Sequence, residues 1–137
     1  MSDYAKPLPL VTPDNRAFWE ATRRHELCLP HCRNCQRPHY PPGPLCPFCF
    51  DTGLEWRRLS GRGRISSWVV VHREWFASFR ADLPYPVVQV ELDEGPRLTA
   101  GVVDMDNDAL RVGLPVEVVF RDVTGEVALP FFRPRTE

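Results

Sequence analysis

A chain of 137 residues, 43% hydrophobic and 26% charged, has the size and composition of one soluble globular domain, or of a small module fused to one. A formal charge of -1 gives no global attraction to nucleic-acid backbones, and no window approaches the roughly 18 consecutive apolar residues of a membrane-spanning helix. The N-terminus lacks the apolar core of a secretory signal. We therefore expect a cytoplasmic protein without a membrane partner, in which clustered cysteines are metal ligands or redox groups and not disulfides.

The first part of the chain is predicted to be an extended arm followed by one helix. The proline-rich start is either an arm laid against a partner or the domain itself, or a frayed terminus. Thr12 followed by Pro13 is a typical helix start, because threonine caps free amides and proline suits the first helical position. A helix is expected over residues 13–25, with Phe18 and Ala21 on its buried face.

Two C-x-x-C pairs dominate the next segment, and they consist of Cys32, Cys35, Cys46 and Cys49. Four such thiolates can close a tetrahedron around zinc, with metal–sulfur distances of about 2.3 Å. Because the protein fills all four positions, the site is expected to be structural and not catalytic. Iron in a rubredoxin-type site uses the same ligands and stays open as the alternative metal.

Three residues near these pairs are predicted not to be ligands. Cys28 lies between two leucines and is interpreted as a buried apolar thiol. His31 and His39 flank the cluster, but four thiolates already saturate zinc, so they are interpreted as outer or surface groups. A thioredoxin-like redox pair is disfavoured, because the proline-filled stretch does not fit a helix start in a βαβ unit.

From Leu54 onward, short runs rich in Val, Ile, Trp and Phe alternate with Gly, Pro and Asp, which is typical of an all-β unit. Strands are expected over residues 56–59, 64–73, 87–92, 98–103 and 116–120, with a short closing piece near 131–132. Five or six strands in roughly 80 residues suit a small barrel.

An aromatic insertion over residues 74–86 interrupts the predicted strands. It carries Trp75, Phe76, Phe79 and Tyr85, and a small barrel has little room to bury all four. Such a surface typically marks a partner or a ligand groove, and the alternative is a plug folded over the barrel mouth.

No catalytic constellation emerges from the sequence. The G-x-S-x-G elbow, the phosphate-binding Gly-Lys-Ser/Thr loop and the H-E-x-x-H pair are all missing. His72, beside the aromatic insertion, has no evident partner as a general base. Asp104, Asp106 and Asp108 lack the glycine and the distal glutamate of a calcium loop. We therefore expect no catalytic residue.

Taken in order, these features resemble the DUF35 family from about residue 13 to Pro134. The motifs that carry the resemblance are the two cysteine pairs and residues 18–21, 40–42, 54–56, 59–63, 70–72, 90–96 and 113–116. The resemblance implies a mainly β fold, with an N-terminal helix and a rubredoxin-like zinc ribbon followed by an OB-fold barrel. The expected divisions are 1–26 for arm and helix, 27–54 for the ribbon and 55–137 for the barrel. Gln36 departs from the glycine that many ribbons carry after the second cysteine, which puts the first turn in doubt.

The resemblance also implies a function. Members of the family look like non-catalytic companions of thiolase-fold enzymes, including lipid-transfer-protein-type thiolases and aldolases that act on acyl-CoA. We accordingly expect an accessory subunit in a hetero-oligomer, in fatty acyl or steroid side-chain degradation. Trp75, Phe76, Phe79, Tyr85 and His72 are the expected contacts with the partner or with acyl-CoA.

Two alternative functions come from other classes. One is a stand-alone acyl-CoA binding module. The other is single-stranded nucleic-acid binding, which would need a basic face with stacking aromatics. The candidates for that face are Arg57, Arg58, Arg62, Arg64 and Arg73.

Overall fold

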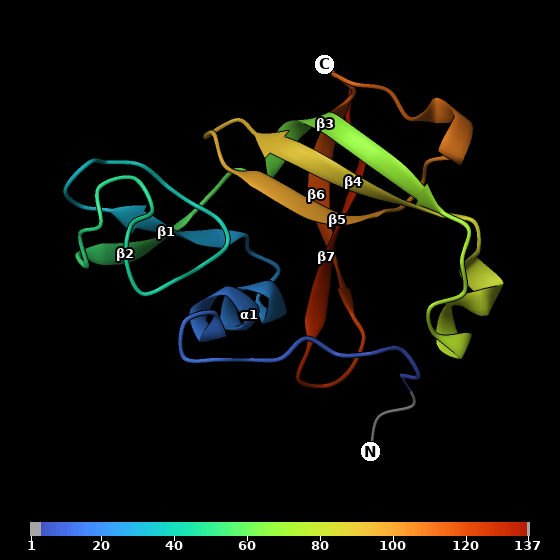
Figure 1. The fold of residues 1–137 in the computed structure, drawn as a ribbon, viewed down its shortest axis with the longest axis horizontal. Coiled ribbons are helices and arrows are strands. Elements are labelled where there is room, and N and C mark those ends of the chain that lie inside the picture. The colour runs from blue at the N-terminus through green and yellow to red at the C-terminus, as the bar shows by residue number, and fades with distance from the viewer. Residues whose placement is uncertain (1–3, 137) are drawn as a thin grey trace.

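The computed structural model describes residues 4–136 and shows a short helix, a two-stranded ribbon and a closed barrel (Figure 1). The helix is α1 (Arg16–Arg23), and the ribbon pairs β1 (Cys28–Cys32) with β2 (Leu54–Arg58). The mainly β class predicted from the sequence, with helix, ribbon and barrel in that order, is confirmed. No described helix is both long enough and apolar enough to cross a bilayer.

Helix α1 begins at Arg16, later than the predicted residue 13, and a turn closed between Thr12 and Asn15 precedes it. The Thr12 N–H donates to Asn15 Oδ1 at 2.7 Å, and the Asn15 N–H donates to Thr12 Oγ1 at 3.3 Å. This reciprocal pair has the pattern of a capping box, so Thr12 caps an amide as predicted, and the regular helix follows from Arg16. Its buried residues include Phe18 and Ala21, as predicted.

The strand expected over residues 56–59 does not join the barrel sheet. Residues Leu54–Arg58 instead form β2 and pair with β1, placing Trp56 opposite Pro30. The Leu59 N–H continues this pairing by donating to Leu27 O at 2.7 Å. Gly61, at a φ of 77°, then turns the chain away before the barrel begins.

Five strands close the barrel in the order β3-β4-β5-β7-β6. They are β3 (Arg62–Val71), β4 (Tyr85–Leu92), β5 (Arg97–Val102), β6 (Pro115–Asp122) and β7 (Ala128–Pro134). The parallel β5–β7 pair completes the five-stranded Greek-key order of an OB fold. Short 3-10 helices, η1 (Ala77–Asp82) and η2 (Asn107–Ala109), lie in the β3–β4 and β5–β6 connections.

One hydrophobic core joins all three parts of the chain. Phe18 of α1 packs in the same cluster as Leu27 and Leu29 from the ribbon side. The barrel contributes Ile65, Val88, Val90, Leu92, Leu98, Leu110, Val116 and Phe132 to it. The ribbon and the helix are therefore fixed against the barrel by shared burial and not merely tethered to it.

Gly63 is the position where this packing tolerates a side chain least. A Cβ there would collide with the Glu91 carbonyl oxygen across the β3–β4 pair. Gly63→Ala is therefore expected to lower the free energy of unfolding by about 1–3 kcal/mol. Gly43→Ala is the control, because nothing lies within 4 Å of a Cβ at that position. Urea denaturation of the metal-loaded variants measures both, and an equal midpoint for the two would contradict the assigned contact.

Candidate metal centre and aromatic groove

The two cysteine pairs fold into two turns with the same hydrogen bonds. The Gln36 N–H donates to Cys32 O at 2.9 Å, and the Phe50 N–H donates to Cys46 O at 2.9 Å. The Cys35 N–H also points at Cys32 Sγ, at 3.5 Å. Cys32 is the last residue of strand β1, so this strand positions the first cysteine of the cluster.

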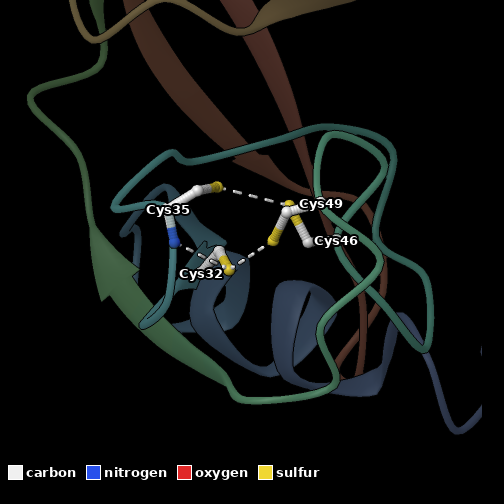
Figure 2. A group of neighbouring side chains, drawn as sticks. All are labelled: Cys32, Cys35, Cys46 and Cys49. Carbon is white, nitrogen blue, oxygen red and sulfur yellow. Dashed lines mark hydrogen bonds between the residues drawn. The ribbon is translucent and has the colours of Figure 1, made fainter.

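The four thiols converge on one point (Figure 2), and all four Sγ atoms lie within 4.8 Å of one another. Cys32 and Cys49 approach to 3.6 Å, as do Cys35 and Cys46. These spacings match the edges of about 3.8 Å expected in a tetrahedron with 2.3 Å metal–sulfur bonds, and exceed the roughly 2.05 Å of a disulfide. The residues fit a tetrahedral metal ion, and the predicted four-cysteine cluster is positioned to bind one.

The thiols differ in how readily they ionise. Burial, reinforced by hydrogen bonds from its neighbours, raises the pKa of Cys35 to about 12. The Asn34 side-chain amide, 3.5 Å from Cys49 Sγ, lowers the pKa of Cys49 to about 6. Metal binding at neutral pH must therefore displace protons from the cluster, so affinity should fall as the pH falls.

The residue after each cysteine pair adopts the left-handed conformation that favours glycine. Gln36 has a φ of 63° and Phe50 a φ of 64°. The first turn therefore forms although Gln36 stands where many ribbons carry glycine. The Gln36 side chain donates to Arg33 O at 2.7 Å. Phe50 is 72% exposed, so burial does not offset the strain in its turn.

The neighbouring candidates are not among the clustered ligand atoms. Cys28 is buried in β1, as predicted, and burial raises the pKa of its thiol. His39 is 3% exposed, and neither ring nitrogen has a hydrogen-bond partner. Burial lowers the pKa of His39, which keeps the ring neutral at pH 7.

The aromatic insertion has two different faces. Trp75 and Phe76 are 63% and 55% exposed, and the Arg73 guanidinium lies over the Trp75 ring at 4.3 Å. Phe79 and Tyr85 are half-buried and stack on each other at 5.4 Å. The four aromatics expected to form one surface are thus divided into an outward pair and an inward pair.

The inward pair borders a groove of about 690 Å³ on the barrel face of β4 and β5. Its lining is Tyr4, Lys6, Pro7, Phe18, Trp19, Tyr40, Phe79, Asp82, residues 84–87 and 98–102, Arg121, Val123 and residues 129–131. The Lys6 ammonium reaches Asp82 at 3.0 Å and lies 5.3 Å from the Phe79 ring centroid. The N-terminal arm is therefore laid against the domain.

Sequence reasoning missed Lys6, Trp19 and Phe131 as groove residues, because they come from three separate parts of the chain. Lys6 is the sole lysine of the sequence, which was the one available signal. His72 follows β3, is exposed and does not line the groove. The proposed basic cluster is divided, since Arg57 pairs with Glu55 of the ribbon whereas Arg73 lies over the insertion.

Comparisons with known proteins agree with this architecture. The model of the ChsH2 rubredoxin-like zinc ribbon domain matches residues 19–55, and that of the ChsH2 C-terminal OB-fold domain matches residues 56–121. A DUF35 domain-containing scaffold protein of Methanothermobacter thermautotrophicus is 35% identical over 134 residues, covering 93% of this chain and 100% of the relative. The chain belongs to the DUF35 family.

Two solved structures and one longer relative are also similar to this DUF35 chain. A solved structure named Ltp2-ChsH2(DUF35) aldolase contains a chain with 33% identity and a TM-score of 0.83, covering 93% of this chain and 98% of that one. A probable enoyl-CoA hydratase alpha subunit of Thermomonospora curvata is 33% identical over 94% of this chain, which spans 40% of that relative's length. A DUF35 protein of unknown function from Sulfolobus solfataricus, at 14% identity and a TM-score of 0.62, shares the fold.

Removing one buried thiol tests the metal centre. Cys46 is fully buried, so Cys46→Ser is expected to lose the bound metal and unfold the ribbon. Cys28→Ala is the matched control, because Cys28 is buried outside the cluster and should keep the metal. Metal content by mass spectrometry and circular dichroism report the outcome; full metal content in Cys46→Ser would overturn the assignment.

Replacing Phe50 tests the strain in the second turn. Phe50→Gly is expected to raise the free energy of unfolding by about 1 kcal/mol, because glycine adopts a positive φ without steric cost and the exposed ring loses little burial. Phe48→Gly serves as the control, since Phe48 is 48% exposed but has no positive φ. Thermal unfolding of the metal-loaded proteins gives the comparison, and destabilisation by Phe50→Gly would refute the strain.

Proposed function

We propose that this DUF35 chain is a non-catalytic accessory subunit that binds a thiolase-like enzyme, of the lipid-transfer-protein thiolase or aldolase type, and supports its acyl-CoA chemistry. The observation that carries the proposal is the match to a chain of the Ltp2-ChsH2(DUF35) aldolase, at 33% identity, over nearly the full length of both chains. The relative named as a scaffold protein, which this chain covers completely, supports the same role. The resulting assembly is a hetero-oligomer.

The four-thiol cluster supports a non-catalytic role. Within residues 4–136 the one cluster of ligand atoms that could hold a metal is the four thiols. A site with four protein ligands leaves no position for a water or substrate, so it stabilises the fold and activates nothing. We propose zinc as the resident ion, in agreement with the zinc-ribbon family model, and a cytoplasmic location for the assembly.

The two faces of the insertion suit two contacts. Trp75 and Phe76 are exposed aromatics of the kind that anchor protein interfaces, so we assign them to the thiolase-like partner. Phe79 and Tyr85 line the groove and are assigned to the acyl group. His72, exposed beside the insertion, is assigned to the partner side. We assign fatty acyl or steroid acyl chains to this groove, because relatives are named as a probable enoyl-CoA hydratase alpha subunit and a 3-oxo-4,17-pregnadiene-20-carboxyl-CoA hydratase alpha subunit.

A stand-alone acyl-CoA binding module is the second candidate, and the groove is the observation that favours it. The two candidates differ in what the lone chain does. Titration calorimetry with an acyl-CoA and the purified chain should give weak binding if a partner completes the site, and tight binding if the module acts alone. Single-stranded nucleic-acid binding is a third hypothesis, which a salt-dependent shift with single-stranded DNA would favour.

Truncating the outward aromatics tests the partner contact. The double variant Trp75→Ala/Phe76→Ala is expected to weaken binding to a thiolase-like protein of the same organism by at least about tenfold, or about 1.4 kcal/mol. Its stability should change little, because both side chains are largely exposed. Leu10→Ala, which truncates an 81% exposed side chain on the arm, is the control. Co-purification and calorimetry measure binding, and unchanged affinity in the double variant would reject this contact.

A further inference from the structure

Strand β3 is paired along its whole length on one side but only at its start on the other. Strand β6 pairs with β3 over Arg62, Gly63 and Arg64 alone. Ile65 then bonds to the β5–β6 connection, as its N–H donates to Leu114 O at 3.0 Å and its carbonyl accepts from Gly113 N at 2.8 Å. Beyond that point, among the described residues, β4 is the one strand that pairs with β3. Figure 1 shows β4 lying between β3 and β5.

The printed hydrogen bonds fix which backbone groups of β3 point to the open side. Asp93 N–H donates to Arg62 O at 2.9 Å, whereas Leu92 N–H donates to Pro96 O at 2.8 Å. Odd-numbered residues of β4 therefore bond toward β3, and even-numbered ones bond toward β5. This alternation suits Pro86, whose missing N–H falls on the β5 side.

The register transfers this alternation to the far half of β3. Val69 lies opposite Val87 and Val71 lies opposite Tyr85, so both bond to β4. The N–H and C=O groups of Trp68 and Val70 consequently point away from β4, toward the open edge. Two donors and two acceptors are thus presented in line along one strand.

The open edge lacks the features that usually prevent pairing. Its sequence from 67 to 71 is Ser-Trp-Val-Val-Val, without charge or proline. Trp68 is 38% exposed and Val69 is 60% exposed. An uncharged strand rich in β-branched and aromatic residues, open along one side, is a template for another strand.

We propose that this edge pairs with the same edge of a second copy of the chain, antiparallel and about a two-fold axis at Val69. In this register Trp68 of each copy lies opposite Val70 of the other. Both edge N–H groups and both edge C=O groups of each copy are therefore hydrogen-bonded. The dimer goes beyond the proposed function and does not depend on it.

A charge at the centre of the pairing tests the proposal. Val69→Lys brings two like charges directly opposite each other, so the dimer should weaken at least about tenfold. Val112→Lys is the matched control, because Val112 is 67% exposed and lies outside β3. Sedimentation equilibrium of the metal-loaded chain should give a concentration-dependent dimer for the wild type and for Val112→Lys, and a monomer for Val69→Lys. A monomeric wild type, or a dimer unaffected by Val69→Lys, would overturn the proposal.

Amide hydrogen exchange reads the register directly. The amides of Trp68 and Val70 should exchange slowly in the dimer and quickly in Val69→Lys, whereas those of Val69 and Val71 should be protected in both by their bonds to β4. Equal exchange at Trp68 and Val70 in the two proteins would refute pairing through this edge. Protection of these amides only in a complex with the thiolase-like protein would also overturn it, since the occupant would then be the enzyme.

Discussion

Convergence of four thiols on one point, where they can bind a metal ion, is the constraint on which the rest of this structure depends. The ribbon that carries them has few apolar residues of its own, and zinc binding to such segments contributes on the order of 10 to 16 kcal/mol at neutral pH. That binding energy fixes β1 and β2, and the ribbon side then places Leu27 and Leu29 in the core that it shares with α1 and the barrel. A metal ion bound by the four thiols would therefore organise the domain, in keeping with the structural role that we propose for it.

The barrel carries two surfaces that the four-thiol cluster does not form: the aromatic insertion and the groove. The insertion between β3 and β4 turns Trp75 and Phe76 outward and Phe79 and Tyr85 inward, onto a groove that the arm borders through Lys6. The outward pair precedes η1, whereas Phe79 lies within η1 and Tyr85 begins β4. These two faces are the ones to which we assign the proposed contacts with an enzyme and with a ligand.

The metal cluster and the barrel could be predicted from the sequence, because both follow from local patterns. Paired cysteines indicate the cluster, and short apolar runs separated by turn residues indicate the barrel. The sequence could not assign β2, since the run at Leu54–Arg58 suits any strand and only the Gly61 turn decides its partner. The predicted start of α1 differs from the structure because the capped turn between Thr12 and Asn15 precedes the regular helix. The groove and the open β3 edge depend on register and on contacts between distant segments, which no local pattern records.

The most direct test of this account is calorimetric titration of a thiolase-like protein of the same organism into the chain, before and after the metal is removed by a chelator. If the metal organises the surface that binds the enzyme, the metal-loaded chain binds the thiolase-like protein. The metal-free chain then loses this binding and regains it when zinc is added. Equal affinity of the stripped chain would contradict the organising role of the metal, and no binding by the loaded chain would contradict the role as an accessory subunit.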